Sequence, residues 1–256
     1  MAFCIKMQPF LADRYYHYLK EAFPEQAMDA FMTAFHRYAS QRGIRAAQRA
    51  IRDGAPLDFE HYQKYREVVS TPQMREIDGP GRSEHTVTEN CYTGHVYECS
   101  SHNCFRELNS PEEVEQFFCY HIDRFNVHGF NPDLPYEVIS TLCDSSCCVH
   151  RAGPTPIRPG AELGKRMEDA PPYPFIVANE YFTMKKMITA IFGEPGRSIA
   201  ETVKEDFIRQ YGSEDWAELC RYQHVDFDIH YPLCLDPQWL LSVSGSSGTS
   251  EPPRLK

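Results

Sequence analysis

Residues 110–151 constrain the fold most strongly, because they combine an amphipathic helix, a stop signal and a hairpin. Apolar residues recur at helical spacing through the first half of this segment, which predicts a helix with one buried face. Gly129 and the Asn-Pro pair that ends at Pro132 stop the helix, since proline disfavours a helical conformation at the residue before it. The chain then alternates over 134–142 and returns over 147–151, which predicts two antiparallel strands.

Further helices are predicted on both sides of this segment. Apolar stripes at helical spacing place them at 10–22, 24–54, 58–69, 198–212 and 213–222. A serine followed three residues later by a glutamate predicts capping boxes at Ser110 and Ser198. Residues 85–99 alternate loosely and carry threonine, valine and tyrosine, which predicts one or two strands, and 71–81 is expected to be a loop. We therefore expect an α+β fold, with amphipathic helices on one face of a small antiparallel sheet and additional C-terminal helices.

The chain is expected to divide into four parts. Residues 1–151 form the α+β core, and residues 152–174, rich in proline and glycine, form a linker or a long loop. Residues 175–241 form a C-terminal helical part that packs on the core. Residues 242–256 are expected to be a disordered tail, because they contain few apolar side chains to bury.

Charge and cysteine content restrict the partners and the compartment. The formal charge is −10 and no basic stripe is present, so nucleic acid is not an expected partner. No apolar run is long enough to span a bilayer, and the N-terminus has charges where a signal peptide needs an apolar core. We therefore expect a cytoplasmic protein with no membrane partner, whose ten cysteines are free thiols rather than a disulfide framework. The sequence leaves open whether the protein forms a homo-oligomer.

Two pairs of reactive side chains stand at ordered positions. Cys119 and Asp123 are four residues apart and share one side of the predicted helix. Cys148 and His150 share one face of the last strand, with Arg151 on the other face. A thiol, a carboxylate and an imidazole that meet in one cavity could carry out hydrolysis. Taken one at a time, each side chain is better explained as structural, because free cysteine is commonly buried as a small core residue.

A basic helix and scattered histidines supply further candidates. An arginine in the second half of the 24–54 helix, such as Arg42, could bind a substrate carboxylate with two hydrogen bonds, although a solvated basic face is the commoner arrangement. Histidine and cysteine recur from His95 to His121, but no CxxC pair and no HExxH motif accompany them. We predict no metal site and no cofactor. The cysteines nevertheless leave open a redox-sensing or metal-sensing protein, as an alternative to an enzyme or a ligand-binding module.

Four blocks of sequence carry a family likeness. They are FHRYASQRGIRAAQRA at 35–50, HVYECSSHNCFREL at 95–108, FFCYHIDRFNVHGFNPDL at 117–134 and STLCDSSCCVHR at 140–151. In order and spacing they resemble the L-2-amino-thiazoline-4-carboxylic acid hydrolase family, and the third block is the most specific. The hairpin turn lacks the Gly-Asp pair usual in that family, and the C-terminal part lies outside the pattern.

The resemblance implies metal-independent opening of a cyclic amidine, 2-aminothiazoline-4-carboxylate, to an N-carbamoyl cysteine. In that reaction Asp123 would be the acid and base, Cys119 a nucleophile or a pocket thiol, and His150 a proton shuttle. The groups expected to bind this small-molecule substrate are Cys99, Asn131, Cys148, Arg151 and Arg42.

Other functions stay open from the sequence. The same scaffold could serve a biosynthetic hydrolase that acts on another small heterocycle, or a cyclase or isomerase. The family is also distantly similar to small-molecule-binding domains of the vinyl-reductase type, which would bind a ligand without turnover.

Overall fold

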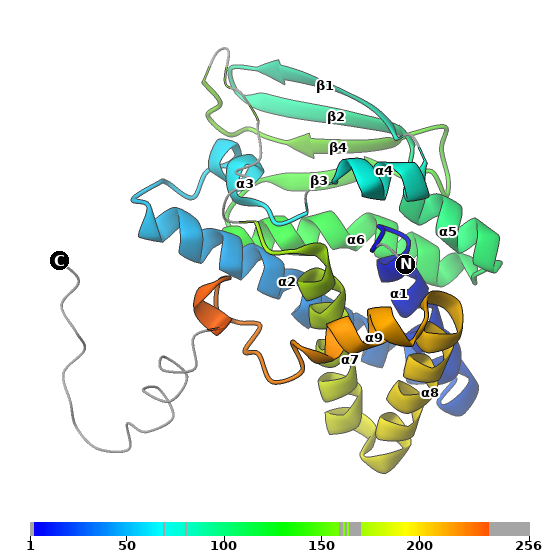
Figure 1. Ribbon diagram of the computed structural model, residues 1–256. Coiled ribbons are helices and arrows are strands. Elements are labelled where there is room, and N and C mark those ends of the chain that lie inside the picture. Colours follow the sequence, from blue (N-terminus) through cyan, green and yellow to red (C-terminus); the bar gives the residue numbers. More distant parts are fainter. Residues whose placement is uncertain are drawn as a thin grey trace, which may run out of the picture.

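Helix α6 (Glu112–Phe130) lies between a small sheet and most of the other helices in the computed structural model of the protein (Figure 1). The structure describes residues 3–68, 70–79, 81–158, 161, 163 and 170–235. The predicted α+β class is confirmed. The other helices are α1 (Met7–Ala22), α2 (Ala27–Arg52), α3 (Phe59–Tyr65), α4 (Pro72–Asp78), α5 (Ser100–Leu108), α7 (Tyr173–Phe192), α8 (Glu194–Tyr211) and α9 (Ser213–Cys220), with a 3₁₀ turn at Leu233–Leu235.

The sheet is antiparallel and has the order β1-β2-β4-β3. Its strands are β1 (Arg82–Thr88), β2 (Cys91–Glu98), β3 (Tyr136–Ser140) and β4 (Cys148–Ala152). His150 of β4 is flanked by Gly94 on β2 and Val138 on β3. Because strand side chains alternate, Cys148, His150 and Ala152 point to the covered face of the sheet, and the exposed Arg151 points away from it.

Helices α2 and α6 touch backbone to backbone, and two glycines make this approach possible. A Cβ added at Gly43 would lie 2.0 Å from the carbonyl oxygen of Asn126, and one added at Gly129 would lie 2.3 Å from the carbonyl oxygen of Ser40. Any side chain at either position would push the helices apart. Gly129 was expected to stop the helix, but α6 continues to Phe130 and the glycine serves packing instead. The contact fixes the side chains of α2 relative to those of α6.

A buried ion pair network ties the segment after α3 to helix α2. Arg45 donates to both carboxylate oxygens of Glu67, at 2.8 and 2.5 Å, and Arg49 donates to Glu67 at 3.1 Å. Burial alone would raise the pKa of Glu67, but the two guanidinium groups hold it below the usual value. Arg45 also donates to Asn179 of α7 at 2.9 Å, so the network joins three parts of the chain.

Several predicted boundaries are wrong for local reasons. The expected loop at 71–81 contains α4, because Pro72 occupies the first turn and the Thr71 hydroxyl accepts a hydrogen bond from the amide of Met74. No helix was predicted between the expected strands at 85–99 and Ser110, but α5 occupies Ser100–Leu108. The expected helix at 58–69 is shorter in the structure: Asp58 is its N-cap, and α3 runs from Phe59 to Tyr65.

Neither predicted capping box forms. Pro111 is the residue that precedes α6, so Ser110 lies one position too far from the helix, and its hydroxyl oxygen is buried without a hydrogen bond. Ser198 lies inside α8, which begins four residues earlier at Glu194. The serine-to-glutamate spacing was present in both places, but the helices started elsewhere.

The C-terminal helices share the main apolar core with the N-terminal ones. Phe175 and Tyr181 of α7 and Phe207 of α8 are buried with Tyr15 of α1 and Phe35 of α2 in one cluster. The predicted tail at 242–256 lies outside the described residues. All ten cysteines are free thiols, as predicted. Among the described helices, none is both long enough and apolar enough to cross a membrane.

Candidate active site

A cavity of about 240 Å³ opens where α2, α6 and the covered face of the sheet meet. Helix α6 supplies Cys119 and Asp123 from successive turns, and β4 supplies Cys148 and His150 from the same strand face. Arg42 of α2 closes the cavity from the side of the helices. The cavity is also lined by Gln8, Tyr62, Arg66, Cys99, Ser101 and Asn126, together with apolar side chains. A thiol-rich, partly charged cavity of this kind suits a small polar ligand.

Most of the predicted site residues therefore lie in one place. Cys119, Asp123, His150, Cys99, Cys148 and Arg42 all line the cavity. Within the 110–151 segment, Cys119 and Asp123 of the helix meet Cys148 and His150 of the last strand, because the hairpin folds back over α6.

Asn131 and Arg151 were predicted with the others but do not line the cavity. Asn131 follows α6, and its side-chain amide donates to the carbonyl of Leu57 at 2.8 Å, which makes it a structural link. Arg151 is on the opposite face of the sheet from His150, with its side chain 48% exposed and paired with Glu137. The alternation of strand side chains separates Arg151 from its neighbour His150.

Asp123 and His150 face each other across the cavity. Oδ2 of Asp123 lies 3.8 Å from Nδ1 of His150, and the hydroxyl of Tyr136 lies 2.9 Å from the same nitrogen. Burial raises the pKa of Tyr136 well above its ordinary value, so its phenol stays protonated beside the imidazole. The Asp123 side chain is 48% exposed and that of His150 is 14% exposed, so the carboxylate lies toward solvent and the imidazole deeper. The pair can exchange protons with a bound ligand.

Three thiols line the wall between α6 and β4, and all of them stay protonated near neutral pH. Burial raises the pKa of Cys99, and it raises that of Cys148 to about 12. The pKa of Cys119 is raised because its thiol donates a hydrogen bond to Cys143 and because it is buried. A protonated thiol is a weak nucleophile, so these three thiols are better suited to contact a ligand through their polarisable sulfur atoms than to attack it.

Two arginines of the cavity form no ion pair with a carboxylate among the described residues. Arg42 is only 8% exposed; its Nη1 donates to the Tyr38 hydroxyl at 3.3 Å, and its Nε is buried with no hydrogen-bond partner among the described residues. Arg66 likewise has a buried Nε without a partner there. In contrast, Arg45 and Arg49 of the same basic helix are bonded to Glu67. A buried guanidinium with open donors is ready to bind a carboxylate.

Sequence reasoning missed Arg66 and the buried Glu180. Arg66 was expected inside a helix, whereas α3 ends at Tyr65 and the chain turns there. Glu180 of α7 accepts a hydrogen bond from Gln8 at 3.4 Å, and burial raises its pKa to about 8. Glu180 is therefore largely neutral at neutral pH and does not cancel the charge of the nearby Arg42. No local pattern marks either residue, because both reach the cavity region through tertiary packing.

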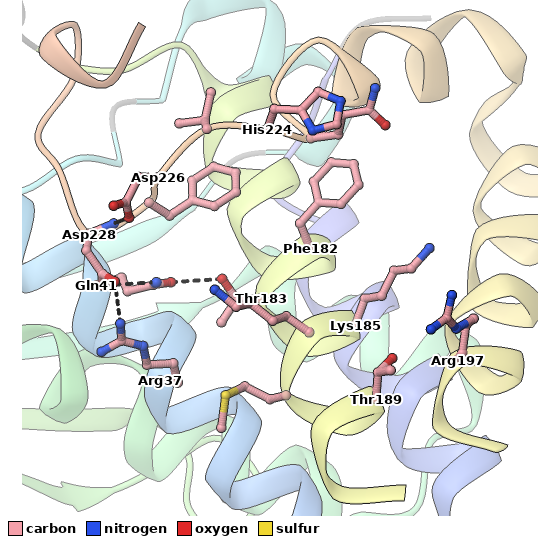
Figure 2. Close-up of a pocket in the computed structure, with 15 residues that line it drawn as sticks. Arg37, Gln41, Phe182, Thr183, Lys185, Thr189, Arg197, His224, Asp226 and Asp228 are labelled. Carbon is pink, nitrogen blue, oxygen red and sulfur yellow. Dashed lines mark hydrogen bonds and ion pairs between the residues drawn. The ribbon is translucent and has the colours of Figure 1, made fainter. Parts of the chain in front are cut away.

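A larger cavity, about 900 Å³, lies on the other side of α2, between α7 and residues 223–228 (Figure 2). Its lining contains none of the predicted site residues. Three of its basic side chains are paired with carboxylates, Arg37 with Asp228, Lys185 with Glu201 and Arg197 with Glu194, whereas Lys186 forms no ion pair among the described residues. Because the smaller cavity brings together the predicted thiols, the carboxylate of Asp123 and the imidazole of His150, we take it as the candidate active site.

Comparison with known proteins gives one match. The family model described as L-2-amino-thiazoline-4-carboxylic acid hydrolase matches residues 5–150, which include α6, the strands β1, β2 and β3, the first part of β4 and the lining of the candidate site. No curated protein and no solved structure gives a significant match.

Proposed function

Because the chain belongs to the L-2-amino-thiazoline-4-carboxylic acid hydrolase family, we propose that it hydrolyses a small cyclic amidine that carries a carboxylate. The substrate is 2-aminothiazoline-4-carboxylate or a heterocycle of the same shape and charge. The observation that carries the proposal is one cavity with open arginines on one side and the Asp123–His150 pair on the other.

The arginines bind the carboxylate of the substrate. Arg42 has an unpartnered Nε, and Arg66 lines the same cavity, so the two guanidinium groups form an anion site that excludes water when filled. A carboxylate there leaves the ring pointing toward β4. The cavity of about 240 Å³ suits a ligand of this size better than a peptide or a nucleotide.

Asp123 and His150 carry out the proton transfers. The Asp123 carboxylate accepts hydrogen bonds from the protonated amidine, which makes the ring carbon between nitrogen and sulfur more electrophilic. His150 takes a proton from water as its oxygen forms a bond to that carbon. The carbon–sulfur bond then breaks, His150 returns its proton to the departing sulfur, and the new hydroxyl group becomes the urea carbonyl by giving its proton to the Asp123 carboxylate. The product contains the atoms of substrate plus one water.

Water is proposed as the attacking group, rather than the thiol of Cys119. The pKa of Cys119 is raised by its hydrogen bond to Cys143 and by burial, so little thiolate forms at neutral pH. Cys119, Cys148 and Cys99 then form a soft wall against the sulfur edge of the ring.

The proposal is tested by incubating the purified protein with L-2-aminothiazoline-4-carboxylate and measuring product by mass spectrometry. We expect a species heavier by one water that carries a new free thiol. The Asp123→Asn variant should lose this activity, and Asp133→Asn, an exposed carboxylate on the loop after α6, is the matched control. Binding of the substrate without any product would instead favour a ligand-binding module. A product without a gain of water would favour a cyclase or isomerase.

A further inference from the structure

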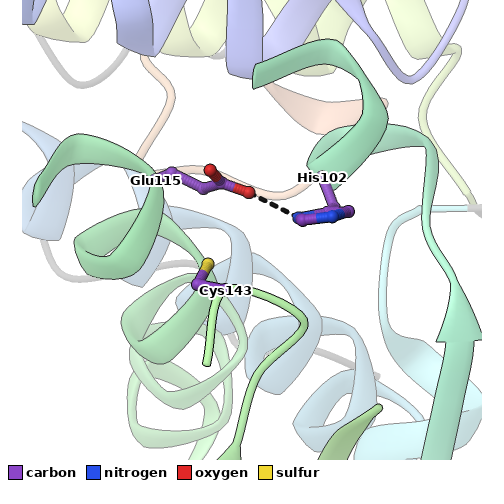
Figure 3. Close-up of side chains that lie close together, drawn as sticks. All are labelled: His102, Glu115 and Cys143. Carbon is purple, nitrogen blue, oxygen red and sulfur yellow. Dashed lines mark hydrogen bonds and ion pairs between the residues drawn. The ribbon is translucent and has the colours of Figure 1, made fainter. Parts of the chain in front are cut away.

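A second group of reactive side chains lies behind Cys119, outside the lining of the candidate active site. His102 of α5, Glu115 of α6 and Cys143 of the loop between β3 and β4 converge there (Figure 3). One possible ligand atom from each residue lies within 4.8 Å of the other two. Nδ1 of His102 is 2.5 Å from Oε1 of Glu115. Three separate segments of the chain therefore present an imidazole, a carboxylate and a thiol to one point.

The burial of Glu115 sets this group apart from a surface cluster. Its side chain is only 3% exposed, and among the described residues no lysine or arginine is bonded to it. A buried carboxylate is costly unless a cation or several donors compensate it. His102 is the one ionic partner found in the described chain, and its side chain is itself largely buried. A cation bound between these three side chains would compensate the buried carboxylate.

Cys143 supplies the thiol of this group, and its sulfur lies within 4.8 Å of a possible ligand atom of His102 and of Glu115. The thiol of Cys119 donates a hydrogen bond to Cys143. The hydroxyl of Thr141 lies next to it and accepts from the Cys143 amide at 3.3 Å. The sulfur atoms of Cys119 and Cys143 are therefore neighbours, and Cys119 can serve as a further ligand.

We propose that His102, Glu115 and Cys143 bind a zinc ion, with the sulfur of Cys119 as the fourth ligand. Zinc takes four ligands of this mixed nitrogen, oxygen and sulfur type in tetrahedral geometry. Bond lengths to zinc place neighbouring ligand atoms roughly 3–4 Å apart, which needs only side-chain adjustment here. No CxxC or HExxH spacing marks these residues in the sequence, because they come from α5, from α6 and from the loop between β3 and β4.

The ion would have a structural effect that is distinct from the proposed hydrolysis. It would join α5, α6 and the hairpin loop, and so would hold the wall of the cavity that Cys119 provides. The hydrolysis proposed above routes no step through this ion. Each of the two proposals can therefore fail while the other stands.

The test measures metal binding directly. The full-length protein, stripped with a chelator and then incubated with Zn²⁺, should retain one zinc per chain after gel filtration, as measured by mass spectrometry of the metal. With Co²⁺ in place of zinc, the near-ultraviolet band of thiolate bound to cobalt should have the intensity of two Co–S bonds. Zinc should also raise the midpoint of thermal unfolding.

Variants decide whether these residues are the ligands. Cys143→Ser and His102→Ala should each lose the cobalt band and the thermal shift, whereas Cys220→Ser, a half-buried cysteine on α9, should keep both. Circular dichroism of each variant without metal shows whether it folds, and a folded Cys143→Ser that still binds zinc stoichiometrically overturns the proposal. So does a wild-type protein that retains no zinc. A band of one Co–S bond would overturn the assignment of Cys119 as the fourth ligand.

Discussion

Asp123 and His150 lie 3.8 Å apart across the candidate active site, although one belongs to the central helix and the other to the last strand of the sheet. The hydroxyl of Tyr136, 2.9 Å from the same histidine nitrogen, gives the imidazole a neutral partner on its other side. The imidazole thus lies between a carboxyl group from the helix and a phenol from the sheet.

The first prediction concerns the proton-transfer pair. Replacing His150 by glutamine keeps a polar side chain but removes the titratable ring, so turnover should fall by about 10²–10⁴-fold. Binding of the substrate should change little, because the carboxylate is held elsewhere. The matched control is His95→Gln on β2, whose side chain lies on the opposite face of the sheet. Steady-state kinetics on both variants provide the comparison, and equal activities would remove His150 from the mechanism.

The second prediction concerns Arg42, which is proposed to bind the carboxylate of the substrate. Arg42→Gln should lower kcat/KM by about 10–100-fold, since a hydrogen bond to a charged group contributes about 1.5–3 kcal/mol. Most of the effect should be in KM, and calorimetry should show a matching loss of affinity. Arg42→Lys should rescue poorly, because an ammonium group cannot form two parallel hydrogen bonds.

Arg151→Gln is the control for this variant. Its guanidinium pairs with Glu137 on the exposed face of the sheet and does not line the cavity. An Arg151→Gln protein with the same rise in KM as Arg42→Gln would show that the carboxylate binds at a different place.

The third prediction concerns pH and Glu180. The pKa of this buried carboxyl is about 8 in the folded protein, above the value of about 4.3 for an unfolded glutamate. Folding therefore favours the protonated form, and the free energy of unfolding falls as the pH rises from about 4.3 to about 8. The slope from this one group is at most about 1.4 kcal/mol per pH unit.

Glu180→Gln cannot ionise and should lose that part of the pH dependence. Urea unfolding of both proteins at several pH values across this window gives the difference directly. The exposed Glu205→Gln on α8 should leave the wild-type profile intact. Parallel profiles for wild type and Glu180→Gln would contradict the raised pKa.

The fourth prediction concerns the contact between α2 and α6. Gly43→Ala would bring its Cβ within 2.0 Å of the Asn126 carbonyl oxygen, so the helices must separate. The free energy of unfolding should drop by about 1–3 kcal/mol or more. At Gly81, the same change meets its nearest atom at 3.7 Å, which is ordinary contact, and Gly81→Ala should be nearly neutral. Chemical denaturation of the two variants distinguishes a steric effect from a general effect of alanine.

Local patterns predicted several of the side chains that line the cavity, but not the other residues around them. The four-residue spacing of Cys119 and Asp123, and the alternation that pairs Cys148 with His150, each placed two side chains on one face. The helix face with Cys119 and the strand face with His150 both line the same cavity, because the hairpin packs over the helix. Spacing along one helix or strand predicts which side chains share a face, but it does not predict which residues of other segments that face contacts.

Residues outside such patterns could not be found from the sequence. Arg66 reaches the cavity because α3 ends one residue earlier, and Glu180 comes from a helix beyond the family-matched region. The arginines of α2 cannot be told apart in the sequence, yet Arg45 and Arg49 form ion pairs with a buried carboxylate and Arg42 does not. The identity of each partner depends on contacts between distant segments.

The buried ion pairs of Glu67 fix the backbone that carries Arg66. Glu67 follows Arg66 in the chain and is bonded to two arginines of α2, so this segment is ordered before any ligand arrives. If the carboxylate of a substrate binds at Arg42 and Arg66 as proposed, little free energy is spent on ordering the protein. The distance from this proposed anion site to His150 would then select ligands by length, since a longer or shorter arm between carboxylate and ring would leave the imidazole out of range.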